Sequence, residues 1–148
     1  MNAYKSKTLA AWLALLGGGL GLHRFYLHGP RDVWGWLWPL PTLLGLYGVR
    51  RALNLGQDDQ LSWLLVPMLG LALAAAMLAG ILYGLTPDER WNAEHNAGTG
   101  REHRAGWGVV FAVVLCLGIG ATVLMATIAY GGQRFFEYQV EEGRKISQ

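Results

Sequence analysis

Charged residues are scarce in this sequence, and two long stretches contain none. Asp, Glu, Lys and Arg make up 15% of the 148 residues, against roughly 25% in soluble domains. Residues 61–85 and 105–130 carry no charge over 25 and 26 positions. About 20 helical residues cross a bilayer core of about 30 Å, so each stretch is long enough to span a membrane. Core helices of soluble proteins are usually shorter and less apolar than this.

Several classes of protein need residues that this chain lacks. Its one cysteine, Cys116, cannot form an intrachain disulfide and cannot make a metal site alone. The net charge of +2 gives no dense basic face, so we expect no nucleic-acid partner. No H-x-x-x-H or H-E-x-x-H pattern occurs. We therefore expect no metal, no cofactor and no enzymatic activity.

Two shorter apolar segments precede the long ones. Residues 8–22 follow a basic start, as in a signal peptide, but no A-x-A cleavage pattern follows, which favours a retained helix. Residues 33–49 contain Pro39 and Pro41. Proline removes a backbone hydrogen bond, so this second segment should be kinked or interrupted, and a re-entrant segment is the alternative. The predicted fold class is all-α and integral to the membrane, with four transmembrane helices arranged as two helical hairpins.

This pattern also predicts the organisation of the chain. The parts are a first hairpin at 1–52, a linker at 53–60, a second hairpin at 61–130 with a polar loop at 86–104, and a polar or interfacial tail at 131–148. With both termini on one side, Lys and Arg divide seven to five in favour of that side. The positive-inside rule then predicts a multi-pass protein of the cell (inner) membrane with cytoplasmic termini.

The connection between the first two segments concentrates polar and aromatic side chains. The residues predicted to contact a partner or lipid there are His23, Arg24, Phe25 and Tyr26. Arg24 can bind a lipid phosphate or a carboxylate of a partner through two parallel hydrogen bonds. Alternatively, Arg24 extends to the headgroups and caps carbonyls at the end of the first helix, which is the interpretation we favour.

Four features of residues 5–51 occur together. They are a basic Lys5-Ser6-Lys7 start, a glycine-rich stretch at 17–21, the sequence His23-Arg24-Phe25-Tyr26-Leu27, and Gly35. With them, this part of the chain resembles the TM-2 domain family. The resemblance implies two short transmembrane helices joined by a brief loop. It implies no activity, although signalling roles have been suggested for animal members. His28 departs from the glycine that the family usually has there.

Small residues recur at a spacing of four in two of the apolar segments. Gly17 and Gly21 form one such pair, and Gly80 and Gly84 form another. In lipid, small residues allow helices to approach closely. We predict that these glycines pack helices, mostly within one chain, while a homo-oligomer or a larger membrane complex is also compatible with them.

The loop at 86–104 contains histidines and carboxylates. His95 and His103 each follow a glutamate, and such groups can bind a metal or transfer protons. A solvated connector is the interpretation we favour, because the middle of the loop is rich in Asn, Gly and Thr. His23 and His28 lie in the other turn on the same predicted side, so all four histidines are candidates to meet there.

The apolar segments contain no Asp, Glu, Lys or Arg. Coupled transporters usually need such a group inside the membrane. We therefore predict a non-enzymatic integral membrane protein, an interaction or accessory subunit of a membrane complex, with the lipid bilayer as its first partner. The alternative is a small transporter or channel component, in which Thr122 and Thr127 line an oligomeric pore.

Overall fold

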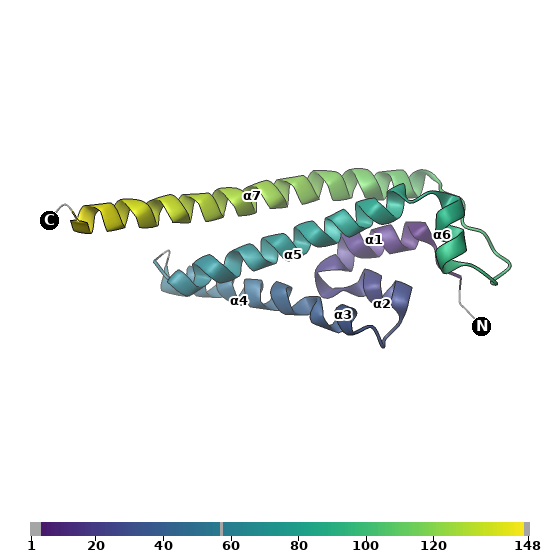
Figure 1. The fold of residues 1–148 in the computed structure, drawn as a ribbon, viewed down its shortest axis with the longest axis horizontal. Coiled ribbons are helices and arrows are strands. Elements are labelled where there is room, and N and C mark those ends of the chain that lie inside the picture. Colours follow the sequence, from purple (N-terminus) through teal and green to yellow (C-terminus); the bar gives the residue numbers. More distant parts are fainter. Residues whose placement is uncertain (1–3, 57, 147–148) are drawn as a thin grey trace.

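Helices make up the regular structure of the described part of the chain. The computed structural model describes residues 4–56 and 58–146 (Figure 1). In chain order the elements are α1 (Lys7–Gly17), the 3-10 helix η1 (Gly18–Leu20), α2 (Leu22–His28), α3 (Val33–Leu37), α4 (Pro39–Leu55), α5 (Gln60–Leu85), α6 (Asp88–His95) and α7 (Trp107–Ile146). The predicted all-α class is confirmed. Among the described residues, α5 and α7 are the helices long and apolar enough to cross a membrane alone.

The central helix of the bundle is α5. Helices α1, α4 and α7 all pack along it, and α1 also packs on α7. The prediction was two separate hairpins. In the structure, α1 and α4, which belong to the first predicted hairpin, both pack on α5 of the second. Glycines make the close approach possible: a methyl group at Gly45 of α4 would overlap the backbone nitrogen and Cβ of Leu69. Likewise, a methyl group at Gly84 would overlap Val113 of α7.

The first predicted transmembrane segment, at 8–22, turns back instead of continuing. Helix α1 ends at Gly17, η1 follows, and Gly21 adopts the left-handed conformation with φ of 74°. Only glycine adopts this conformation without strain, and a side chain at Gly21 would also lie 2.9 Å from the carbonyl oxygen of Gly35. Helix α2 then runs back toward the end of the bundle at which the chain begins (Figure 1).

The tip of this turn lies against the middle of α5. A methyl group at Gly18 would overlap Ala76, and the Thr42 hydroxyl of α4 donates a hydrogen bond of 2.7 Å to the Gly19 carbonyl. Residues 23–26 were predicted to form a tight loop. In the structure they are helical and belong to α2.

The second predicted segment is interrupted as expected. Helix α3 ends at Leu37, and α4 begins at Pro39 after the single residue Trp38. Pro39 and Pro41 occupy the first turn of α4, where backbone N–H groups have no partner within the helix, so their missing donors cost little.

The two termini lie at opposite ends of the bundle (Figure 1). This arrangement differs from the predicted one, in which both termini share one side, because the turn at Gly21 removes one passage along the bundle and leaves α3–α4, α5 and α7 running its length. Helix α7 is continuous for 40 residues. The predicted separate tail from residue 131 is its last part, and residues 147–148 lie outside the described residues.

Glycine contacts of α4 with α5 are open to a direct test. Replacing Gly45 with Ala should lower the free energy of unfolding by about 1–3 kcal/mol, because α5 must move to accept the methyl group. The matched control is Gly118→Ala on α7, where the new methyl group would lie within 4 Å of no described atom beyond the adjacent residues and the backbone of α7 itself. It should be neutral or slightly stabilising, since Ala favours helix over Gly. Thermal unfolding in one detergent measures both, and equal effects would contradict this packing.

Candidate functional site

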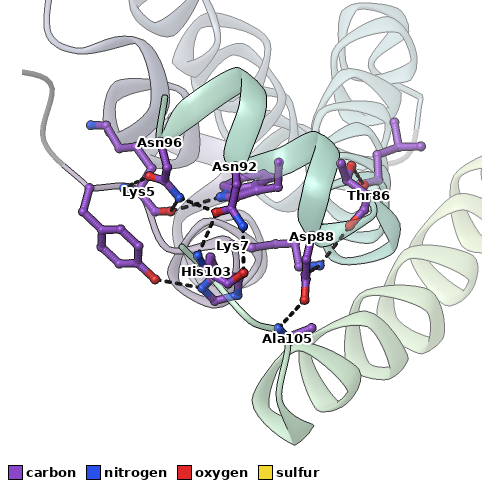
Figure 2. A network of polar contacts seen from close by, with 11 residues as sticks. Lys5, Lys7, Thr86, Asp88, Asn92, Asn96, His103 and Ala105 are labelled. Atoms are coloured by element: carbon purple, nitrogen blue, oxygen red, sulfur yellow. Dashed lines mark hydrogen bonds and ion pairs between the residues drawn. The ribbon is translucent and has the colours of Figure 1, made fainter. Parts of the chain in front are cut away.

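Helix α6 and its C-cap residue, Asn96, present three polar side chains on one side. Pro87 precedes the helix, and Asp88 and Glu89 lie in its first turn, where acidic groups favour the helix dipole. Asp88, Asn92 and Asn96 are spaced four apart, so they line one side of the helix. Figure 2 shows that they face residues from the N-terminal segment and from the loop before α7.

Asn96 holds the backbone of Lys5 from both sides. The Lys5 N–H donates to Asn96 Oδ1 at 2.7 Å, and Asn96 Nδ2 donates to the Lys5 carbonyl at 3.1 Å. The same carbonyl accepts a 3.0 Å hydrogen bond from Nε1 of Trp91, whose side chain is fully buried. The backbone N–H and carbonyl of Lys5 therefore both have hydrogen-bond partners on α6 or at its C-cap.

Asn92 binds the backbone of His103 in the same manner. The His103 N–H donates to Asn92 Oδ1 at 2.7 Å, and Asn92 Nδ2 donates to the His103 carbonyl at 2.9 Å. Asn96 Nδ2 also donates to Asn92 Oδ1 at 2.9 Å. This bond joins the pair of hydrogen bonds to Lys5 with the pair to His103. Helix α6 therefore binds the start of the chain and the end of the loop at once (Figure 2).

Asp88 adds an ion pair between a buried lysine and a partly exposed carboxylate. Lys7 Nζ donates to Asp88 Oδ1 and, at 2.9 Å, to the Thr86 carbonyl, and the Lys7 side chain is 3% exposed. The Ala105 N–H donates to Asp88 Oδ2 at 2.7 Å. The hydrogen bonds from Lys7 and then Ala105 hold the pKa of the Asp88 carboxyl below its usual value. We call Lys5, Lys7, Asp88, Asn92, Asn96 and His103 the cap network.

The predicted contact residue His23 is buried inside the protein. Its side chain lies between the rings of Trp38 and Tyr83, with centroid distances of 5.3 and 5.9 Å. Its Nδ1 has no hydrogen-bond partner among the described residues. Phe25 packs in a similar way, at 5.2 Å from Trp36 and against Gly35. Both side chains are thereby committed to packing within the chain.

Arg24 is bound to a residue that the sequence interpretation did not consider. Arg24 Nε donates to Asp32 Oδ2 at 2.8 Å. Asp32 also caps α3, because its Oδ1 accepts the Trp34 N–H at 3.2 Å. The Arg24 hydrogen bond lowers the pKa of the Asp32 carboxyl. Arg24 therefore binds a carboxylate of its own chain, and neither a lipid phosphate nor the helix-end carbonyls are needed as its partner. The aspartate before an apolar segment was the signal for this cap.

Tyr26 connects the motif with the basic start of the chain. Lys5 Nζ donates to the Tyr26 carbonyl and lies 4.9 Å from the centre of its ring, and the Ser6 N–H donates to Tyr26 Oη at 2.7 Å. The two lysines of the basic start thus have separate partners, since Lys5 binds α2 and Lys7 binds α6.

Residues 86–104, interpreted as a solvated connector, contain α6 and the buried side chains of Trp91, Asn96 and His103, whereas residues 97–102 are mostly exposed. The histidines do not all share one site: His23 packs on Trp38 and Tyr83, whereas His103 lies beside Tyr4, at 3.0 Å between Nδ1 and Oη. In the described ranges no three His, Cys, Asp or Glu residues are placed to hold a metal ion. The fourfold spacing of Asp88, Asn92 and Asn96 was the signal in the sequence for this helix and its polar face.

The comparisons with known proteins concern the N-terminal part of the chain, which contains Lys5, Lys7, the turn at Gly21 and α2. Residues 3–50 match the model of the TM2 domain. Neither a curated protein nor a solved structure matches the chain. The resemblance of the N-terminal third is thereby confirmed, and together with the membrane-length helices α5 and α7 it indicates a membrane protein. Asp88, Asn92, Asn96 and His103 lie outside the match, so the cap network binds the TM2 region to the remaining two thirds of the chain.

The ion pair of the buried Lys7 gives a specific prediction. Lys7→Met should lower the free energy of unfolding by about 1–3 kcal/mol, because Asp88 and the Thr86 carbonyl lose their donor. The matched control is Arg90→Met, which breaks an exposed pair with Glu94 on the same helix and should have no measurable effect. Thermal unfolding in detergent measures both variants. Equal loss in the two would show that the burial of Lys7 contributes nothing.

Proposed function

We propose that this protein is a non-enzymatic integral membrane protein that acts as an interaction or accessory subunit of a membrane complex. The observation that carries the proposal is the uncovered apolar surface of α5 and α7. In the most apolar 18 residues of α5 and of α7, only 28% and 22% of the residues are buried. Exposed apolar surface of this extent is rare in water-soluble monomers and is normally covered by lipid or a partner.

We further propose that α3–α4, α5 and α7 cross the bilayer, while α1–η1–α2 enters and returns on one side. Helix α1 has 11 residues, about 16 Å, which is too short to cross alone and disfavours four complete spans. Irregular backbone at membrane depth needs protein partners. The hydrogen bond from Thr42 to the Gly19 carbonyl and the packing of Gly18 on Ala76 supply them at the tip of the turn.

The distribution of basic residues supports an orientation with the α6 end in the cytoplasm. The α6 end has seven Lys and Arg residues and the opposite end has five, which favours a cytoplasmic N-terminus and a C-terminus across the membrane. The seven are Lys5, Lys7, Arg24, Arg31, Arg90, Arg101 and Arg104, and the five are Arg50, Arg51, Arg134, Arg144 and Lys145.

The bonding of polar groups favours an interaction subunit over a transporter, a channel or an enzyme. Thr122 and Thr127, the candidate pore residues, donate to carbonyls of their own helix at 2.9 and 2.7 Å. Thr127 also packs against Gly70 of α5. The polar side chains of the cap network bind one another or the backbone, an arrangement suited to holding segments together.

The topology can be tested with epitope tags at the two ends of the chain. In sealed vesicles of one orientation, protease should remove one tag and spare the other, because the proposal places the termini on opposite sides. As a control, a cysteine at position 98 in a Cys116→Ser background should react with an impermeant thiol reagent from the side of the N-terminal tag. Removal of both tags from one side would support four spans.

The choice between an interaction subunit and a transporter needs a second experiment. After extraction in mild detergent, we expect the protein to migrate in a complex of defined mass that contains a second protein or a second copy. Liposomes containing the purified protein should show no ion flux above that of empty liposomes. A reproducible flux that Thr122→Val and Thr127→Val abolish would favour the oligomeric pore.

A further inference from the structure

The imidazole of His103 is enclosed in the cap network with one of its nitrogens unused. The residue is 6% exposed. A 3.0 Å hydrogen bond joins its Nδ1 to Tyr4 Oη, while its Nε2 is buried and has no partner in the part of the chain that the structure describes. Two hydrogen bonds from Asn92 fix the backbone of His103 beside α6, so the ring projects from a backbone that is itself part of the cap network.

The charged groups around this ring come from two elements. Asp88 of α6 favours a positive charge on His103, and Lys7 of α1 opposes it. Both carboxylate oxygens of Asp88 are already used, by Lys7 Nζ and by the Ala105 N–H. Along the chain, Glu102 and Arg104 flank His103 with opposite charges, and the first charged residue of α7 is Arg134, far along that helix. The N-terminal segment contributes Tyr4, which is titratable and contacts the ring.

Protonation changes what the ring requires. A neutral imidazole has one N–H donor, whereas the protonated ring has two. Tyr4 Oη would then have to accept a hydrogen bond from Nδ1, and the Nε2–H would need an acceptor that the closed cap does not provide. A buried charge without a partner is costly. The protonated ring must therefore displace Lys7 from Asp88 or leave its position.

We propose that the cap network is a pH-sensitive latch, in which protonation of His103 releases the backbone of Lys5, His103 and Ala105 from α6 and its C-cap residue Asn96. The opening would uncover Trp91 and widen the groove of about 1170 Å³ that lies between α6 and residues 100–105. This inference goes beyond the proposed function and does not depend on which side of the membrane holds the cap.

The direction of the pH dependence follows from the chemistry of the closed state. Burial lowers the pKa of His103 below its ordinary value of 6.5, so the closed cap binds fewer protons than the open one. Its stability is complete above pH 6.5 and falls as the pH drops toward the lowered pKa. Asp88 remains ionised throughout this window, because its pKa is lowered from 3.8. His95 needs a control, since burial lowers its pKa too and its ring lies 4.4 Å from that of Trp91.

Hydrogen exchange of the whole protein in detergent, normalised for the intrinsic effect of pH, tests the latch. Between pH 7.5 and 5, we expect protection of the Lys5, His103 and Ala105 amides, which donate to Asn96, Asn92 and Asp88, to fall by up to about tenfold for each pH unit below 6.5. His103→Asn retains a polar atom near the position of Nδ1 for Tyr4 and does not titrate. It should keep protection at pH 7.5 and lose the pH dependence. His95→Asn and His28→Asn should retain the pH dependence.

Two results would overturn the latch. One is unchanged protection of the Lys5, His103 and Ala105 amides between pH 7.5 and 5 in the wild-type protein. The other is a loss of protection at pH 5 that persists in His103→Asn. If that variant does not hold the cap at pH 7.5, the NMR titration of the His103 ring in the wild-type protein decides the matter. A titration midpoint below 6.5 that coincides with the loss of protection supports the latch, and a midpoint at 6.5 or above contradicts it.

Discussion

The buried ammonium group of Lys7 determines how the two parts of the chain are joined. A charge so removed from solvent requires partners nearby, and they are the Asp88 carboxylate and the Thr86 carbonyl. The start of α1 is thereby fixed to the end of α5 and the start of α6. Asp88 extends the same restraint to Ala105, directly before α7. One ion pair with its hydrogen bonds thus sets the positions of four helices at this end of the bundle.

The TM2 region depends on the rest of the chain for its structure. Its basic start binds α6, its glycine turn packs on α5, and α4 packs on α5 through glycines. The side chains of its motif are committed in the same way, since Arg24 binds Asp32 and His23 packs between Trp38 and Tyr83. The contact surface for lipid or a partner is therefore better sought on the uncovered faces of α5 and α7 than in the motif itself.

The elements that could be predicted from the sequence are those determined by local chemistry. Uncharged runs predict α5 and α7, and the prolines predict the break before α4, because both effects act within a few residues. The turn at Gly21 could not be distinguished from a continuous span, since its glycines are also compatible with a helix in lipid. The pairing of Arg24 with Asp32 and of Lys7 with Asp88 depends on segments that meet only in the folded chain. The order of the loop around α6 was missed because its polar composition was taken as a sign of solvation.

Helix α7 has a mechanical consequence for the molecule. Its 40 residues form one rod of about 60 Å. One end is held at the cap through Ala105, and further along, the guanidinium of Arg134 lies 5.6 Å from the ring centre of Trp63 near the start of α5. The residues beyond Arg134 extend past this second support. Such a rod acts as a lever arm, because a tilt of a few degrees at the cap moves the far end by several ångströms. A local rearrangement at the cap network would thereby become a displacement at the far end of α7.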